Sequence, residues 1–340
     1  MSMTMSHAPA HERSGIFHAR ALVNRGPEGL GNDRRHLLGL EYLDRAEILA
    51  LLDDAEYDLA KLQRDRIPSH ELAGVTILLA FFEDSTRTRI AFELAGRRLG
   101  AVVVSVTSGG LSLSKGESLV DTLRIFEKNG TDLVVVRHAS SGVPEFLARH
   151  VGMGIVNAGD GTHEHPTQGL VDLMTLRQVW RGHFENRRIA IVGDIAHSRV
   201  ARSAIAGLNK LGVKVTVAGP ATLIPVGVEA LGCTLAATAD EALAGADAVM
   251  ALRIQRERME RGLLPSFSEY AKSWGIDARR VALMKPDAVV MHPGPVNRGL
   301  ELAVDVVDGP RSVVLKQVEN GMGVRSAVLR RSARAIRERA

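Results

Sequence analysis

Phe81-Phe82-Glu83-Asp84-Ser85-Thr86-Arg87-Thr88-Arg89 is the stretch that decides the fold, because a strand pattern turns into a helix pattern within it. Residues 75–82 form a short apolar run that is typical of a buried strand. After Ser85, apolar residues recur at the helical period up to Leu99, and Gly100 ends the pattern as a helix C-cap would. A strand therefore leads into a helix through hydroxyl and guanidinium side chains.

This strand-to-helix turn is suited to holding a phosphate group. Unpaired N–H groups and the positive end of the helix dipole gather at the first turn of a helix, so an anion there would meet backbone, hydroxyls and arginines together. The alternative is that Ser85 only caps the helix, while Arg87 and Arg89 lie in solvent.

The rest of the chain alternates strand-like and helix-like patterns, which is typical of the α/β class. The expected strands are residues 75–82, 101–106, 132–137, 154–158, 188–193, 213–218, 247–252 and 288–292. We therefore expect two doubly wound domains with mainly parallel sheets, whose ligands bind beyond the carboxyl ends of the strands. Several polar or loop-forming residues lie at such ends: Ser85, Arg137, Asp194, Arg253 and Gly294.

The chain ends and the middle carry helical or irregular patterns. Residues 1–36 lack periodicity and carry Gly, Pro, His and Arg, so we expect a flexible leader. A transit peptide is the alternative: the scarcity of acidic residues favours it, but the amphipathic helical pattern is missing. Helices are expected at 44–62, around the seam 165–180 and at 324–337. The arginines of the last stretch are predicted to form the solvated face of the final helix: Arg325, Arg330, Arg331, Arg334, Arg337 and Arg339.

Composition narrows the possible functions. The net charge of +4 is mild and aromatic residues make up only 4%, which argues against nucleic-acid binding. The apolar run 75–82 is far shorter than the roughly 20 residues of a membrane helix, so no membrane span is expected. A single cysteine, Cys233, excludes an intrachain disulfide and a cysteine-based metal cluster, and it fits a cytoplasmic protein.

Five motifs resemble those of the aspartate/ornithine carbamoyltransferase family, in order and approximate spacing. They are Ser85 to Arg89, His165-Pro166-Thr167-Gln168, Gly193-Asp194-Ile195 to Arg199, Arg253-Ile254-Gln255 and His292-Pro293-Gly294-Pro295-Val296-Asn297-Arg298. The resemblance extends from about residue 35 to about residue 331. It implies a carbamoyl-phosphate-binding domain at 37–165, an aspartate-binding domain at 166–312, an active site in the interdomain cleft, and a C-terminal helix at 313–340 that packs back on the first domain.

The resemblance also implies the residues that bind carbamoyl phosphate, with no metal and no cofactor. Ser85, Thr86, Arg87 and Thr88 would hold the phosphate, while Thr88, Arg137 and His165 would face the carbonyl oxygen and Gln168 the carbamoyl group. Taken alone, Arg137 could instead be an edge arginine paired with a carboxylate, and His165 a helix-start residue before proline.

Lys115 would act across a subunit boundary. In the family, the loop that corresponds to 108–117 reaches the active site of a neighbouring subunit in a homotrimer, so Lys115 would contact phosphate and aspartate there. A serine of the same loop, Ser112 or Ser114, would accompany it. From the residues alone this is as well explained by a solvated Gly/Ser loop. The family also allows assembly with regulatory or dihydroorotase subunits.

The acceptor distinguishes the branches of the family. The resemblance implies Arg199 for the α-carboxylate of aspartate, Arg253 and Gln255 for its β-carboxylate, and the backbone of Gly294 and Pro295 for its amine. The ornithine branch typically has a cysteine in a His-Cys-Leu-Pro loop, where this chain has proline. Aspartate is favoured. The alternatives are another amino-acid acceptor such as ornithine, or a non-catalytic structural subunit of a pyrimidine-pathway assembly. A dinucleotide site is not supported, because Gly-x-Gly-x-x-Gly is missing.

Overall fold

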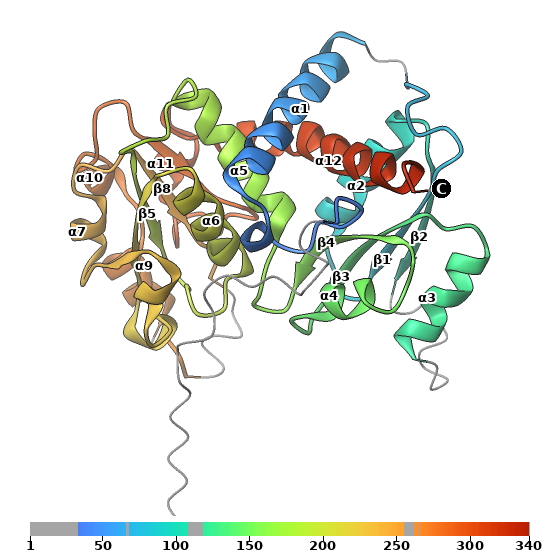
Figure 1. Cartoon of the computed structure of the whole chain (residues 1–340). Coiled ribbons are helices and arrows are strands. Elements are labelled where there is room, and N and C mark those ends of the chain that lie inside the picture. Colours follow the sequence, from blue (N-terminus) through green and yellow to red (C-terminus); the bar gives the residue numbers. More distant parts are fainter. Residues whose placement is uncertain (1–32, 66–67, 108–117, 255–261, 265, 340) are drawn as a thin grey trace, which may run out of the picture.

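The protein has two β-sheets, each made of parallel strands, and helices pack against both sheets (Figure 1). The computed structural model describes residues 33–65, 68–107, 118–254, 262–264 and 266–339. The first sheet has the order β2-β1-β3-β4 and the second the order β7-β6-β5-β8-β9. The strands are β1 (Thr76–Phe81), β2 (Val102–Thr107), β3 (Leu133–His138), β4 (Gly154–Asp160), β5 (Arg188–Val192), β6 (Lys214–Ala218), β7 (Thr234–Leu235), β8 (Ala248–Ala251) and β9 (Val289–Met291).

Helices cover both faces of each sheet. They are α1 (Arg45–Arg64), α2 (Thr86–Arg98), α3 (Leu119–Lys128), α4 (Val143–Ala148), α5 (Pro166–Val179), α6 (Arg199–Lys210), α7 (Ala239–Leu243), α9 (Phe267–Trp274), α10 (Ala278–Val281), α11 (Val304–Val307) and α12 (Val314–Arg337). Alternate residues of β1 enter different cores: Ile77 and Leu79 face α1, α2 and α12, whereas Leu78 and Ala80 face α3 and α4. This two-sided burial confirms the predicted α/β class with parallel sheets.

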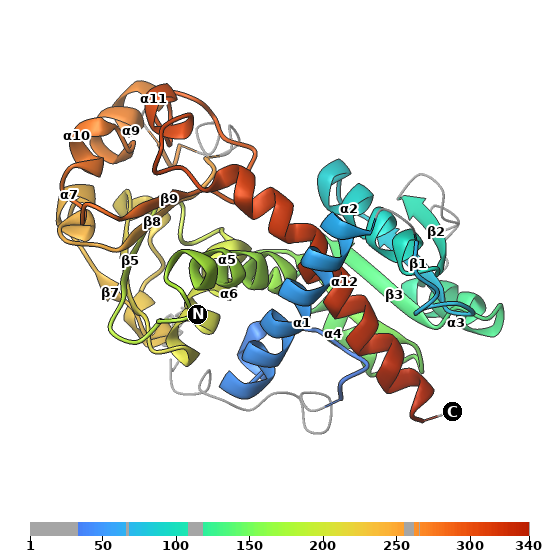
Figure 2. The same cartoon turned by 90° about the horizontal axis from the view of Figure 1, so that it is seen from above.

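Two helices, α5 and α12, join the two sheets. The α5 helix, buried along most of its length, lies between them and packs on α1, α6 and α12. The α12 helix runs from the second sheet towards the first and packs on α1, α2 and α5, as Figure 2 shows from above. Among the described helices, none is both long and apolar enough to cross a bilayer.

Most predicted boundaries are within two residues of the observed ones, but the final helix is an exception. It begins at Val314, ten residues before the predicted start at 324. In this first part the apolar side chains point outward and the polar ones inward: Leu315 and Val318 are 83% and 67% exposed, whereas Gln317 and Asn320 are 3% and 1% exposed. In these first turns the apolar side chains lie on the exposed face and the polar ones on the buried face. The hydrophobic periodicity of the sequence therefore does not indicate a helix there. The two-residue strand β7 was also not predicted.

Strand order places two crevices at the carboxyl edges of the sheets. The chain leaves β1 and β3 in opposite directions, and likewise β5 and β8, so a gap opens beyond each pair. Phe81 is in register with Arg137, and Val192 with Ala251. The segment after β1 therefore lies beside Arg137, and the segment after β5 lies beside the one that carries Arg253.

The contact of α12 with α1 depends on a glycine. A β-carbon on Gly323 would lie 2.3 Å from the carbonyl oxygen of Ala55 and 2.9 Å from Cβ of Leu59. Both distances are shorter than van der Waals contact allows, and the first is to a backbone atom. Only glycine permits the two helices to approach this closely.

We predict that Gly323→Ala destabilises the protein. Overpacking costs roughly 1–3 kcal/mol, and the clash with a backbone atom places Gly323→Ala in the upper part of that range, at about 2–3 kcal/mol. The better helix propensity of alanine offsets about 1 kcal/mol, so the free energy of unfolding in urea should fall by about 1–2 kcal/mol. Lys316→Ala, at an exposed position of the same helix, is the control and should stay within about 0.5 kcal/mol of the wild type. Equal stability of both variants would contradict the packing argument.

Candidate active site

A single carboxylate joins the two halves of the molecule. Glu83, just after β1, accepts hydrogen bonds from Nη2 of Arg137 at 3.1 Å and from Nη2 of Arg199 at 2.8 Å. Arg137 ends β3 of the first sheet, and Arg199 begins α6 on the second. Both guanidiniums are largely buried, and Arg137 also donates to the carbonyl oxygen of Ala158 at 3.2 Å. Arg137 is thus paired with a carboxylate, but not on an outer edge: it lies where the carboxyl edges of the two sheets meet, a region that we call the crevice.

The two guanidiniums crowd against the backbone at Gly159. A β-carbon there would lie 3.1 Å from Nη1 of Arg137 and 3.1 Å from Nη1 of Arg199, and φ is +119°. Nη1 of Arg199 is buried and has no hydrogen-bond partner among the described residues, and the same holds for Nε of Arg137. Burial and the neighbouring Arg199 lower the pKa of Arg137. The cluster therefore has donors left over for an incoming anion.

A second pair of arginines meets a tight loop after β9. A β-carbon on Gly294, where φ is +68°, would lie 2.5 Å from Nη1 of Arg87. Burial lowers the pKa of Arg87, and the positive charge of Arg253 lowers it further. In the described part of the chain, neither arginine has a carboxylate partner. The first turn of α2 and the loops after β8 and β9 thus present two unpaired cations to the same space.

The start of α2 is free to bind a ligand. Ser85 is the N-cap residue, yet its side chain makes no capping hydrogen bond, so the interpretation that it only caps the helix is wrong. Thr86 and Arg87 follow in the first turn, and Thr88 is buried. The first turn of α2 therefore has backbone N–H groups that the side chain of Ser85 does not cap, next to the hydroxyl-bearing residues Ser85, Thr86 and Thr88.

Two buried histidines lie among these cations. Burial and the charges of Arg137, Arg199 and Arg325 hold the pKa of His165 well below its usual range. His165 precedes α5, and its backbone N–H donates to Oγ of Ser203 at 2.7 Å. Burial, with Arg87 and Arg253, lowers the pKa of His292 to about 3. Both rings are therefore neutral near pH 7 and add no charge.

A fifth arginine lies beneath the crevice on α12. Arg325 is buried, donates from Nη1 to the carbonyl oxygen of Gly321 at 2.7 Å, and lies 5.6 Å from the centre of the Phe92 ring. Burial and Arg87 lower its pKa to about 10. The prediction of a solvated arginine face was therefore wrong for Arg325, and the side chains of Arg330 and Arg331 are also largely buried.

The structure brings together most of the predicted site residues and adds two. Arg87, Arg137, His165, Arg199 and Arg253 converge on the crevice, although they come from segments far apart in the sequence. Lys115, Ser112, Ser114 and Gln255 lie outside the described residues. Sequence reasoning missed Glu83 and Arg325. An acidic residue directly after a strand, beside a basic cluster, was the one available signal for Glu83.

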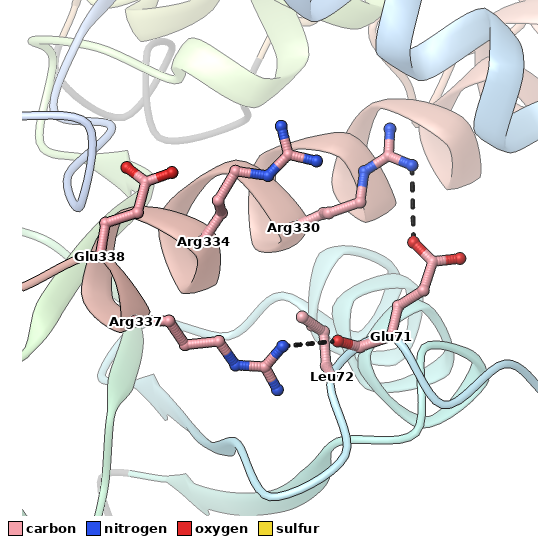
Figure 3. A pocket seen from close by; sticks show the side chains of 6 residues that line it. All are labelled: Glu71, Leu72, Arg330, Arg334, Arg337 and Glu338. Carbon is pink, nitrogen blue, oxygen red and sulfur yellow. Dashed lines mark hydrogen bonds and ion pairs between the residues drawn. The ribbon is translucent and has the colours of Figure 1, made fainter. Parts of the chain in front are cut away.

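The arrangement is built to gather anions. Within the described ranges, no three histidine, cysteine or acidic side chains come together as metal ligands. A hollow of about 300 Å³ exists elsewhere, at the end of α12 (Figure 3), lined by Glu71, Leu72, Arg330, Arg334, Arg337 and Glu338. There, Arg330 pairs with Asp58 and Glu71, and Arg337 donates to the carbonyl oxygen of Glu71. This hollow gathers charges from a single helix end and Glu71, whereas the crevice brings arginines of both sheets together, so the crevice is the better candidate.

Comparison with known families covers nearly the whole described chain. The family model "aspartate/ornithine carbamoyltransferase, carbamoyl-P binding domain" matches residues 35–178. The model of the Asp/Orn binding domain of the same family matches residues 185–331. The two matches correspond to the two sheets.

Individual relatives agree with this match. The chain is 50% identical over 297 residues to an aspartate carbamoyltransferase catalytic subunit from Sorangium cellulosum, covering 87% of this chain and 92% of the relative. It is 52% identical over 303 residues to the one from Gluconobacter oxydans, covering 88% and 96%.

Solved structures from both branches of the family are similar. An aspartate transcarbamoylase from Trypanosoma cruzi, in complex with carbamoyl aspartate and phosphate, is 32% identical with a TM-score of 0.78 and covers 87% of this chain and 95% of its own. An ornithine carbamoyltransferase from Thermus thermophilus is 29% identical with a TM-score of 0.76 and covers 87% and 98%.

We predict that His165 stays neutral between about pH 6 and pH 8, because protonation would add charge beside buried guanidiniums. His163 is the internal control: hydrogen bonds to Asp160 and Glu41 raise its pKa to about 10, so it should stay protonated over the same range. Imidazole nitrogen shifts in NMR, assigned with a His165→Gln variant, report both states. A His165 signal that titrates near its ordinary value of about 6.5 would contradict the argument.

Proposed function

The chain belongs to the aspartate/ornithine carbamoyltransferase family, and from this premise we propose that it transfers the carbamoyl group of carbamoyl phosphate to the amine of L-aspartate. The products are N-carbamoyl-L-aspartate and phosphate, a step of pyrimidine biosynthesis. The fold does not select the acceptor, since ornithine enzymes share it. The relatives at about 50% identity favour aspartate.

One observation carries the proposal: arginines from both sheets meet in one crevice. Arg87 and Arg137 come from the first sheet, and Arg199 and Arg253 from the second. A phosphorylated donor and a dicarboxylic acceptor need cationic partners side by side. We accordingly divide the chain into a donor domain at 37–165 and an acceptor domain at 166–312, with 313–340 returning to the first. The active site lies in the cleft between them.

The donor is held at the first turn of α2. Ser85, Thr86, Arg87 and Thr88 bind the phosphate through hydroxyls, backbone N–H groups and a guanidinium. The absence of a capping bond at Ser85 supports this. Binding there stabilises the charge that grows on phosphate as it leaves.

The carbonyl oxygen of the donor faces Thr88, Arg137 and His165. A neutral His165 donates a hydrogen bond from its ring N–H, and the low pKa means that it acts without becoming charged. The unpartnered Nε of Arg137 offers a further donor. Gln168 contacts the amide of the carbamoyl group. Positioning and electrostatics, rather than a covalent nucleophile, then carry the reaction.

The acceptor binds from the second sheet. Arg199 takes the α-carboxylate of aspartate, for which its unpartnered Nη1 is available beside the bond to Glu83. Arg253, with Gln255, takes the β-carboxylate, and the carbonyl groups of Gly294 and Pro295 face the amine. The amine nitrogen attacks the carbamoyl carbon, the C–N bond forms, and the C–O bond to phosphate breaks. The departing phosphate accepts a proton from the amine.

We further propose a homotrimer with shared sites. Five apolar side chains at the β2 edge of the first sheet are between 43% and 58% exposed: Ile90, Leu94, Val102, Val104 and Ile125. They come from β2, α2 and α3, next to the segment 108–117 in the chain. Covering this patch with a second copy would carry Lys115 into the neighbouring crevice. Assembly with regulatory or dihydroorotase subunits and a cytoplasmic location remain expectations, the latter consistent with the buried free thiol of Cys233.

We predict that the purified protein forms carbamoyl aspartate from aspartate but no citrulline from ornithine. Arg87→Ala should lower kcat/KM at least roughly 100-fold, about 3 kcal/mol of transition-state stabilisation. Arg334→Ala is the matched control, because Arg334 is exposed and unpaired among the described residues. Carbamoylation of ornithine alone would overturn the proposal, and an unchanged rate in Arg87→Ala would favour a non-catalytic subunit.

We predict that Arg87→Ala and Lys115→Ala complement each other. If each site uses Arg87 of one subunit and Lys115 of its neighbour, random mixing restores about a quarter of the sites, although each variant alone is nearly inactive. Subunits would be mixed in mild denaturant, dialysed and assayed, with mass determined by light scattering. No recovery in mixtures of trimeric mass would rule out shared sites.

A further inference from the structure

Asp172 is a buried carboxyl group that joins two amide side chains. Its Oδ1 accepts from Nε2 of Gln168 at 2.9 Å and from Nε2 of Gln317 at 2.8 Å. Gln168 lies one turn earlier on α5, and Gln317 lies in the first turn of α12. Oδ2 of Asp172 is buried and has no hydrogen-bond partner among the described residues. The contact between α5 and α12 is therefore made by polar side chains at Asp172, a buried position that an apolar side chain could also fill.

Burying the carboxyl group of Asp172 costs free energy that its two hydrogen bonds only partly offset. Burial raises the pKa of Asp172 to about 7, and the two glutamines offset only part of this. Helix packing alone would be served as well by an apolar side chain, because a buried carboxyl loses hydration that hydrogen bonds only partly replace. What an apolar residue cannot do is set the orientation of two neighbouring amides.

An acceptor oxygen determines which way each amide points. Since Oδ1 accepts, both glutamines must turn their NH₂ groups towards it and their oxygens away. For Gln317, the oxygen then accepts from the backbone N–H of His292 at 3.0 Å. For Gln168, the oxygen makes no hydrogen bond within the described residues and stays available as an acceptor.

One of the two oriented oxygens lies beside the site residues, and the other holds a loop that borders the site. Gln168 follows the site residue His165 by one helical turn. His292 precedes Gly294, whose backbone packs against Arg87, and Nδ1 of His292 accepts from the N–H of Gly294 at 2.8 Å. A chain of hydrogen bonds thus runs from Gln168 through Asp172 and Gln317 to the loop 292–295.

We propose that Asp172 is a positioning residue that aims the Gln168 oxygen at the N–H groups of the carbamoyl donor and, through Gln317, holds the loop 292–295 at the acceptor amine. This inference rests on the proposed function. Asp172 itself touches no substrate; it orients the Gln168 oxygen towards the donor and, through the Gln317 bond to His292, fixes the loop at the acceptor.

The first test compares Asp172→Ala with Asp172→Asn. Alanine removes the acceptor and should lower kcat/KM about tenfold, the loss of about one oriented hydrogen bond. Asparagine keeps an oxygen at the position of Oδ1 and should recover most of that loss. Melting temperatures are measured in parallel, since a merely structural role would lower stability in both variants without changing the kinetics of the folded enzyme. Equal kinetic losses in both would overturn the inference.

The second test asks whether Asp172 acts through the glutamines. In a Gln168→Ala background, Asp172→Ala should change the KM for carbamoyl phosphate by less than about twofold, because the glutamine that it orients towards this substrate is gone. Gln317→Ala should raise the KM for aspartate while that for carbamoyl phosphate stays within about twofold, and this variant keeps the inference testable if Asp172→Ala does not fold. Additive losses, or equal changes in both KM values, would contradict it. If the wild type forms no carbamoyl aspartate, the proposed function fails instead.

Discussion

The site depends on one electrostatic constraint: guanidiniums from two separate sheets occupy the same crevice, and one carboxylate holds them. Glu83 bonds Arg137 from the first sheet and Arg199 from the second. Like charges this close repel each other in a partly buried space, and the carboxylate of Glu83 offsets the repulsion between Arg137 and Arg199. The crevice still carries excess positive charge. That excess is what a pair of anionic substrates would neutralise.

Neutral groups complete this design. Surrounding cations keep His165 and His292 uncharged, so they can offer directed hydrogen bonds without adding repulsion. Arg325 adds a further positive charge from α12. Its guanidinium loses hydration on burial, and its Nε has no hydrogen-bond partner among the described residues. Such strained electrostatics are typical of sites that bind charged ligands, because the ligand supplies the missing partners.

The helices α5 and α12 hold the geometry in place. They lie between the sheets, and their contact is made by Gln317, Asn320 and Asp172 rather than by apolar side chains alone. Directional hydrogen bonds specify register and rotation in a way that apolar packing does not. The close approach of α12 to α1 at Gly323 fixes the other side of the same helix. The packing of α1, α5 and α12 therefore fixes the positions of the loops that border the crevice.

The strands, the strand-to-helix turn at Ser85 and the polar residues at strand ends could be predicted from the amino-acid sequence, because they depend on local periodicity and capping chemistry. Motif resemblance supplied the family, which the comparisons then showed. Only the tertiary structure decided that Glu83 bridges the two arginines, that Arg325 is buried and that Asp172 joins two glutamines. The bonds of Glu83, the bond of Asp172 to Gln317 and the burial of Arg325 against Phe92 depend on residues more than 50 positions apart, and local patterns carry no information on such pairings. For the same reason, the sequence did not predict the first turns of α12, whose polar residues point inward to partners on α5.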